Sequence, residues 1–205
     1  MALWGTSFSG GHVIIEAAKH PEVSAVVAQV PFTDGVSTAW NSYILGDPIF
    51  ALKGTYHGIA DIFASIFTNH RHHVRIAGRP GEAFAMMSRP DSMDGFLKLL
   101  GMSDEKEFEK YNFCPGNIVI TLTFYRPISY ANEVTCPALI IGAENDTLFP
   151  PTGPKKVADK MKKATYISLP MNHFEPYIGE PFEKLVKIMG EFLKSNLELN
   201  SQSKI

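Results

Sequence analysis

The sequence predicts an α/β fold in which a mostly parallel sheet is flanked by helices. Residues 136–142 form a short apolar run opened by a proline, which is typical of a buried parallel strand. Pro150 and Pro151 then open a helical segment at residues 153–163, and residues 164–169 form the next strand. The chain has 205 residues, of which 45% are hydrophobic, so it is long enough for one domain with a sizeable core.

Two further strands are expected near the start of the chain, at residues 2–4 and 23–30. The alanine-rich segment at residues 12–20 lies between them and is expected to be helical. Residues 181–197 carry apolar side chains along one helical face, which predicts a helix that packs on the sheet. Residues 198–205 are expected to be a frayed tail.

The stretch between the second and third strands does not have the pattern of a core sheet. Helices are expected there at residues 50–67, 80–87, 93–100 and 103–111. We therefore predict an α/β core at residues 1–35 and 128–205, with a helical cap insertion at residues 36–127. Caps of this kind shape the choice of substrate through concave, mostly apolar walls. Five apolar side chains are candidates either to line an acyl or aromatic site or for ordinary helix packing: Phe63, Phe67, Phe84, Met86 and Met87.

Residues 5–11 read Gly-Thr-Ser-Phe-Ser-Gly-Gly and join the first strand to the first helix. Such a junction is typical of a nucleophile elbow, in which a strained turn exposes one serine hydroxyl at the top of a sheet. The strained backbone requires small residues two positions either side of the nucleophile. Ser7 has Gly5 and Ser9 in these positions and is our preferred nucleophile. Ser9 is the alternative nucleophile, and a serine-rich loop that caps a helix is the structural alternative.

Asp146 and His173 follow the two later strands of the predicted sheet. Open α/β sheets place their chemistry at the carboxyl ends of the strands, so we expect the two side chains to meet Ser7 at that edge. A serine hydroxyl is a weak nucleophile at neutral pH and needs an adjacent base. His173 would take its proton, and Asp146 would orient the imidazole. Asp34, which follows the strand at residues 23–30, is the main alternative for the acid.

The amide of Phe8 is the predicted oxyanion donor, because it follows the nucleophile in the chain.

The chain resembles the α/β-hydrolases related to X-Pro dipeptidyl-peptidases and to fungal polyketide transferases. The resemblance rests on residues 3–13, 27–32, 126–131 and 173–177. It implies the α/β-hydrolase fold, with Ser7, Asp146 and His173 as the catalytic triad. It does not define the substrate, because the group includes esterases, thioesterases, peptidases and acyl transferases.

The length and composition fit a soluble enzyme, and the predicted triad implies a small-molecule acyl substrate. The net charge of −2 gives no indication of binding to nucleic acid or to a membrane surface. Cys114 and Cys136 are too few for a disulfide framework. No apolar stretch reaches transmembrane length and no signal peptide is visible, so we expect a cytoplasmic protein.

Neither a metal nor a cofactor is expected. His70, His72 and His73 lie close together in the sequence, but no carboxylate or cysteine stands nearby at a spacing suited to metal binding. A solvated basic loop is the expected structure of this segment.

The position of the elbow indicates an incomplete fold. Only a short strand precedes Ser7, so the loop that supplies a second oxyanion donor is expected to be missing. We therefore expect the C-terminal part of a serine hydrolase or acyl transferase that acts on an ester, thioester or amide. The alternative is a non-catalytic remnant or interaction protein that retains the triad residues. The sequence predicts no oligomeric state.

Overall fold

The computed structural model describes residues 1–202, and its internal contacts divide the chain into two units. Residues 1–34 and 126–205 form the first unit, and residues 35–125 form the second. The function of the second unit as a cap stays a prediction.

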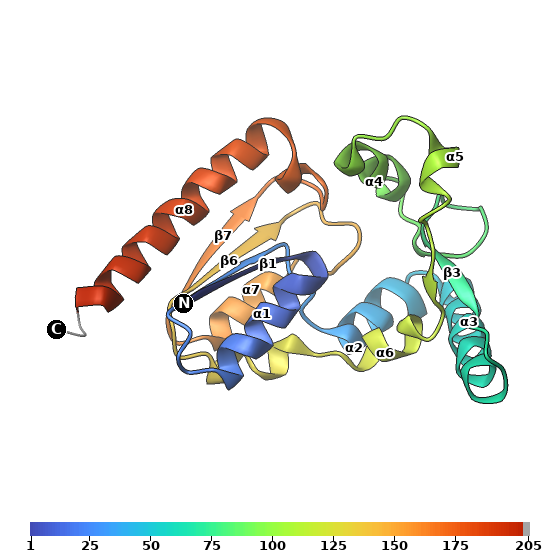
Figure 1. Ribbon diagram of the computed structural model, residues 1–205, viewed down its shortest axis with the longest axis horizontal. Helices are drawn as coiled ribbons and strands as arrows, with labels where there is room; N and C mark the ends of the chain where they lie inside the picture. Colours follow the sequence, from blue (N-terminus) through green and yellow to red (C-terminus); the bar gives the residue numbers. More distant parts are fainter. Residues whose placement is uncertain (203–205) are drawn as a thin grey trace. The chain divides into compact units, whose positions relative to one another are not determined.

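The first unit contains a four-stranded sheet in which every pair of neighbours is parallel (Figure 1). Its order is β1-β2-β6-β7, with β1 at Ala2–Thr6, β2 at Ala25–Gln29, β6 at Ala138–Ala143 and β7 at Ala164–Leu169. All four predicted strands are therefore confirmed, with shifts of a few residues at their ends. β1 and β7 form the two edges of this sheet.

Helices cover both faces of this sheet. They are α1 (Ser7–Lys19), α7 (Gly153–Lys160) and α8 (Gly179–Gln202), with 3₁₀ turns η2 (Pro127–Ser129), η3 (Ala131–Glu133) and η4 (Glu175–Tyr177). α8 continues to Gln202, so the expected tail is helical up to that residue, and residues 203–205 lie outside the described part. No helix in the described part is both long and apolar enough to span a bilayer.

The core of the first unit follows the alternation of side chains along buried strands. Val26 and Ile140 lie in a cluster with residues of α1 and α7 on one face. Val27 and Leu139 lie in a second cluster with residues of α8 on the other face. The near-continuous apolar runs of β2 and β6 are explained by burial on both faces. In Figure 1, α8 accordingly lies on the opposite side of the sheet from α1 and α7.

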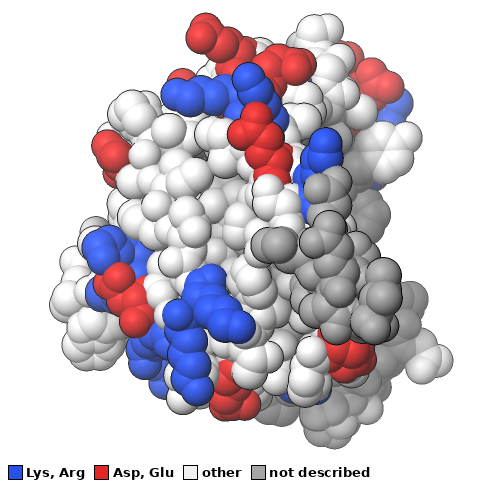
Figure 2. Space-filling view, turned by 90° about the vertical axis from the view of Figure 1, so that its left-hand side faces the viewer, with Lys and Arg blue, Asp and Glu red and all other residues white. Residues whose placement is uncertain are grey.

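The surface shows no extended region of one charge on the face drawn in Figure 2, where basic and acidic side chains lie in mixed groups.

The second unit combines helices with a small sheet of order β4-β3-β5. In chain order it contains α2 (Gly35–Thr38), the π-helical segment η1 (Ala39–Ile44), α3 (Pro48–Phe67), β3 (His73–Ala77), β4 (Ala85–Met87), α4 (Ser92–Leu100), α5 (Glu105–Phe108), β5 (Cys114–Pro115) and α6 (Ile118–Phe124). The helices predicted at residues 50–67 and 93–100 are confirmed. The insertion is not entirely helical, because His73 at the end of the histidine-rich segment begins a strand rather than remaining in a loop.

The helix predicted at residues 80–87 is wrong. Gly81 has a φ of +86°, which interrupts a helix, and the following residues form β4 beside β3. The helix predicted at residues 103–111 is also too long, since α5 ends at Phe108. Asn112 explains this end, because its side-chain oxygen accepts hydrogen bonds from the amides of Ile76 and Ala77 at 3.0 and 2.8 Å.

Asp61 organises the second unit. Its side chain on α3 is fully buried, and Arg71 Nε donates to its Oδ1 at 2.8 Å. The amide of His72 donates to the same oxygen at 2.9 Å, and the amide of Asn117 donates to Oδ2 at 3.0 Å. One carboxylate thus joins α3, the segment before β3 and the start of α6. The hydrogen bonds from Arg71 hold the pKa of Asp61 well below its usual range, against the opposing effect of burial.

We predict that Asp61→Ala lowers the free energy of unfolding by about 3 kcal/mol, because it leaves a cation and two amides without their partner. Because the folded-state pKa lies below the unfolded value, the stabilisation is fully present above about pH 4 and declines as the pH falls through the folded-state value. Urea denaturation of both proteins at pH 7 and pH 3 measures this difference. Asp159→Ala is the control, since its exposed pair with Lys155 contributes less than about 1 kcal/mol. Equal losses for the two variants would contradict the prediction.

Candidate active site

Ser7 lies at the junction of β1 and α1 in a strained conformation. Its φ of +52° is in the left-handed region, which residues other than glycine rarely adopt. β1 ends at Thr6 and α1 begins at Ser7, so the chain turns from strand to helix without an intervening loop. This is the geometry that a nucleophile elbow requires.

Close packing around the elbow explains its glycines. A Cβ atom on Gly5 would lie 2.3 Å from the carbonyl oxygen of Ser9 and 2.9 Å from Val13 Cγ1. A Cβ atom on Gly10 would lie 2.9 Å from Pro31 Cβ. The helix therefore starts against β1 and against the chain that leaves β2, and larger residues at these positions would separate them.

Ser9 occupies a position where the elbow pattern usually has glycine. Its hydroxyl accepts a hydrogen bond from the amide of Thr6 at 2.9 Å and donates to the carbonyl of Thr6 at 2.8 Å. The side chain thus folds back on the preceding turn and needs little space. Ser9, the alternative nucleophile, therefore caps the start of α1 through its contacts with the backbone of Thr6.

The chain leaving β2 supports the elbow. Val30 also has a positive φ, of +38°, and its amide donates to the carbonyl of Ile141 at 2.8 Å. Phe32 follows, and its amide donates to the carbonyl of Ser7 at 2.9 Å. The strained turn at Val30 thus directs the chain toward the backbone of Ser7.

Backbone hydrogen bonds join the loops after β6 and β7. The amide of Glu144 donates to the carbonyl of Leu169 at 2.9 Å, and the amide of Asn145 donates to that of Met171 at 3.1 Å. Asp146 and His173 follow directly on the two bonded segments. The parallel pairing of β6 and β7 is therefore extended past the strand ends, and it brings the acid beside the histidine.

Asp146 is oriented by its own loop. Its Oδ1 accepts hydrogen bonds from the amides of Leu148 and Phe149 at 2.9 and 3.0 Å. Its Oδ2 lies 2.8 Å from Nδ1 of His173. The local turn thus directs one carboxylate oxygen toward the imidazole.

His173 connects the acid to the serine. Its Nε2 lies 2.9 Å from Ser7 Oγ, on the opposite side of the ring from Asp146. A carboxylate only accepts hydrogen bonds, so Nδ1 carries the proton in the neutral ring and Nε2 accepts from the hydroxyl of Ser7. The side chains of His173 and Asp146 are only 4% and 6% exposed, which keeps their contact largely free of solvent.

The loop carrying His173 is held by Asn172. Its side-chain oxygen accepts hydrogen bonds from the amides of Phe174 and Glu175 at 2.9 and 3.1 Å. The carboxylate of Glu175 accepts from the amide of Asn172 at 2.6 Å. This reciprocal pattern closes the turn that carries His173 at the start of η4.

Asp34, the alternative acid, is bound by a different group. Arg126 Nε and Nη2 donate to its two carboxylate oxygens at 2.9 and 3.0 Å. This bidentate pair joins the two points where the chain leaves and re-enters the first unit. The structure therefore brings Ser7, His173 and Asp146 together and places Asp34 in an ion pair.

The sequence did not predict a polar contact at Thr6, the residue that precedes Ser7. The hydroxyl of Tyr177 lies 2.6 Å from Oγ1 of Thr6, and the buried side chain of Gln29 donates to the same oxygen at 3.4 Å. Burial, together with the charge of Asp146, raises the pKa of Tyr177 to about 12, so the phenol stays protonated at neutral pH. The contact links Thr6, the residue before Ser7, to the turn that follows His173. The contact joins residues 171 positions apart in the sequence, so it can be found only from the folded structure.

Aromatic side chains surround the imidazole. The rings of Phe149 and Phe174 meet that of His173 edge-on, with centroids 5.0 and 5.6 Å apart. The ring centroid of Phe32 lies 5.0 Å from that of Phe149 and 6.0 Å from that of Phe8. The site is therefore apolar around its hydrogen-bonded centre.

Phe8 is the second residue of α1. α1 begins at Ser7, so the amide of Phe8 lies in its first turn, at the positive end of the helix dipole. Its function as the oxyanion donor stays a prediction.

The residues that the structure describes contain no group of three side chains suited to hold a metal ion. In the histidine-rich segment, Nε2 of His72 lies 2.8 Å from Nδ1 of His57, and the two rings are stacked.

The chain has the α/β-hydrolase fold. Its parallel sheet, the strand–serine–helix junction and the position of acid and histidine after later strands define this class. Known structures agree. Over 95% of this chain, the α/β hydrolase GrgF from Penicillium sp. sh18 aligns with a TM-score of 0.72 and 18% identity. DcsB, solved in complex with its substrate analogue, aligns with a TM-score of 0.70 and 19% identity. The chain covers 63% and 64% of these two proteins.

Curated relatives are longer than this chain. The chain is 30% identical over 194 residues to the quorum-quenching protein AidA of Acinetobacter baumannii (strain MDR-ZJ06), and it spans 61% of that protein. It is 26% identical over 200 residues to an uncharacterised 31.7 kDa protein of Escherichia coli from the traX-finO intergenic region, and spans 65% of it. No family model matches the sequence.

We predict that Gly5→Ala destabilises the protein by about 3 kcal/mol, because the new methyl group collides with the backbone of Ser9. Gly190→Ala is the matched control. Gly190 lies in α8 with no atom within 4 Å of the added carbon, so alanine is expected to stabilise the helix by up to about 1 kcal/mol. Thermal unfolding followed by circular dichroism compares the two. A Gly5→Ala protein as stable as the wild type would show that the elbow is not tightly packed.

Proposed function

We propose that this chain carries the catalytic centre of a serine hydrolase or acyl transferase that acts on an ester, thioester or amide. The hydrogen-bonded arrangement of Ser7, His173 and Asp146 supports this proposal most directly. The likeness in fold to esterases, lipases and other α/β hydrolases is consistent with it.

The proposed reaction begins with proton transfer from Ser7 Oγ to Nε2 of His173 while Oγ attacks the carbonyl carbon of the substrate. Asp146 stabilises the imidazolium that forms, through its contact with Nδ1. The imidazolium then protonates the leaving group, which departs and leaves an acyl group on Ser7. Water completes hydrolysis, and another nucleophile completes acyl transfer, in each case with His173 as the base.

Negative charge develops on the carbonyl oxygen during this attack. The amide of Phe8 is the proposed donor to that oxygen, with the positive end of the α1 dipole behind it. Removal of one oxyanion donor typically lowers kcat by about 100- to 1,000-fold.

The comparisons suggest which substrates to test. AidA is described as quorum-quenching, so signal molecules of quorum sensing belong in the substrate panel. Simple esters and lipid esters belong there as well, because a monoacylglycerol lipase and the esterase Est1E share the fold.

The second candidate is a non-catalytic protein that retains the triad residues. The observation in its favour is that the chain spans only 61% to 65% of the curated relatives it matches. Absence of any turnover or covalent labelling by a folded chain would favour this candidate.

A fluorophosphonate probe is expected to label the chain, and Ser7→Ala should abolish the labelling because it removes the activated hydroxyl. Ser9→Ala is the matched control and should retain labelling, since Ser9 bonds the backbone of Thr6. Intact-protein mass spectrometry measures the adduct. Labelling that survives Ser7→Ala would exclude Ser7 as the nucleophile.

Asp146→Asn is expected to lower kcat by about 10⁴-fold, because an amide facing Nδ1 favours the wrong imidazole tautomer. Asp34→Asn is expected to retain most of the activity, because Asp34 pairs with Arg126 instead. Ester hydrolysis by the two variants measures the difference. The opposite order of activity would assign the acid to Asp34.

A further inference from the structure

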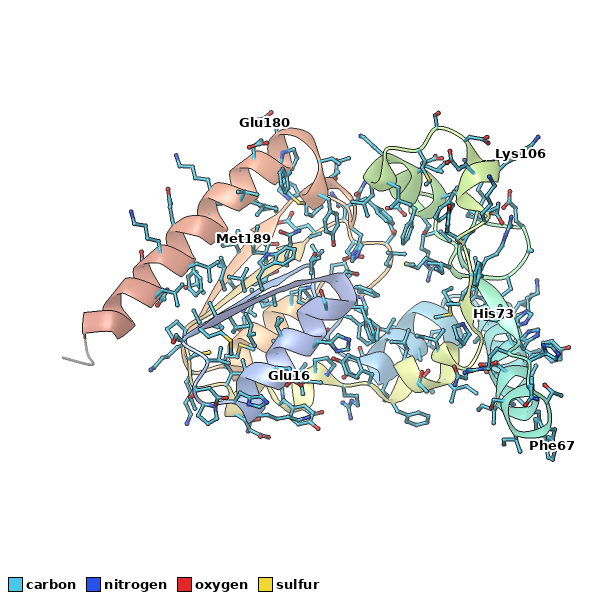
Figure 3. The ribbon with its side chains drawn as sticks, viewed as in Figure 1. Glu16, Phe67, His73, Lys106, Glu180 and Met189 are labelled. Carbon is cyan, nitrogen blue, oxygen red and sulfur yellow. The ribbon has the colours of Figure 1, made fainter. Side chains whose placement is uncertain are left out.

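Helix α3 exposes its large apolar side chains. Six of them are between 45% and 72% exposed, and they form what we call the α3 seam: Ile49, Leu52, Tyr56, Ile59, Phe63 and Ile66. Phe67, labelled in Figure 3, ends the helix and is also exposed. Contiguous apolar surface of this kind usually marks an interaction site.

The buried side of the same helix is made of small or polar residues. Gly54, Gly58 and Asp61 are its buried positions, and they recur at helical spacing. A Cβ atom on Gly54 would lie 3.0 Å from Val119 Cγ1, and one on Gly58 would lie 2.7 Å from Ile120 Cγ1. α6 therefore packs directly on the glycines, and the bulky face of α3 points away from it.

The spacing of the α3 seam identifies the kind of partner. Its members follow one another at alternating intervals of three and four residues from Ile49 to Ile66. This 3.5-residue period is the pattern of helices that pair through knobs-into-holes packing. The seam is therefore suited to a second helix that carries the same period.

Charge favours a second copy of this chain over a lipid surface. Helix α3 contains one lysine, Lys53, and one acidic residue, Asp61, which is buried in its ion pair with Arg71. Helices that lie on membranes usually carry a polar face rich in lysine and arginine, which α3 lacks. None of the six residues of the seam is charged, and the exposed Lys53 flanks it beside Leu52.

The size of the seam also fits a dimer. Side chains of these types at these exposures present on the order of 100 Å² each, or roughly 600 Å² for the seam. A standard interface buries roughly 800 Å² per partner, and Ile62 and Phe67 beside the seam add to its area.

We propose that two copies of the chain associate through an antiparallel pairing of their α3 helices. In the antiparallel register centred between Tyr56 and Ile59, Leu52 of one copy faces Phe63 of the other. Tyr56 likewise faces Ile59, so each aromatic ring meets an aliphatic side chain, and large and smaller groups alternate across the contact. A parallel pair would stack Phe63 on Phe63. Antiparallel helix dipoles also attract one another.

Sedimentation equilibrium of residues 1–205 at about 1 to 100 µM tests this proposal, because this range covers the weak association expected of a contact near the lower size limit of specific interfaces. The wild type is expected to dimerise, and Phe63→Glu and Leu52→Lys are each expected to weaken the dimer at least 10-fold. Both side chains are exposed, so neither change should unfold the chain, and circular dichroism checks this. Leu100→Glu, an exposed position on α4 outside the seam, is the control and should leave the dimer unchanged.

A mixture of the Phe63→Glu and Leu52→Lys proteins tests the register. The antiparallel pairing places the new carboxylate opposite the new ammonium group, so the mixture should form a heterodimer that neither protein forms alone. A wild type that stays monomeric at 100 µM, or a dimer that survives both substitutions, would overturn the proposal. Failure of the mixture to associate would overturn the antiparallel register. A monomeric wild type that binds phosphatidylcholine vesicles through the seam would assign the surface to lipid.

Discussion

The parallel register of the first sheet is the constraint on which the candidate site depends. The carboxyl ends of β1, β6 and β7 lie at the same end of the sheet. Each of these strands leads into one of the three hydrogen-bonded residues Ser7, Asp146 and His173. A slip of one residue in any pairing would turn the side chains of that strand to the opposite face and separate the group. The backbone hydrogen bonds that continue between the loops after β6 and β7 fix the register of these two segments directly before Asp146 and His173.

Backbone strain is concentrated at the ends of two neighbouring strands. Ser7 and Val30 both have positive φ, and such residues typically cost about 1 to 3 kcal/mol each. The carbonyl of Ser7 accepts a hydrogen bond from the amide of Phe32, and the amide of Val30 donates one to the carbonyl of Ile141. Close packing at Gly5 and Gly10 leaves the junction little room to relax. Strain is thus held by the surrounding structure, as expected where a side chain has to be presented in one exact direction.

Much of the first unit could be predicted from local patterns. Runs of apolar residues located its strands, and Ser7, Asp146 and His173 could be placed at one edge because parallel strands share their carboxyl ends. The contact between Thr6 and Tyr177 could not be predicted, since it joins residues 171 positions apart and neither has a distinctive local pattern. The helix expected at residues 80–87 failed for a related reason. Pairing with β3 determines the conformation of β4, and this pairing is a tertiary effect that overrides helical spacing.

The pattern of α3 predicted a helix correctly but not which face lies inside. Amphipathic spacing is usually interpreted on the assumption that the apolar face packs within the same chain. In α3 the inner positions are Gly54, Gly58 and Asp61, whose small size and ion pair suit close contact with α6 and Arg71. Burial of an apolar side chain typically contributes about 1.5 to 3 kcal/mol, so a helix that leaves six of them in water forgoes a large stabilisation. Pairing of the same face with a second helix recovers that stabilisation without any change in the inner contacts.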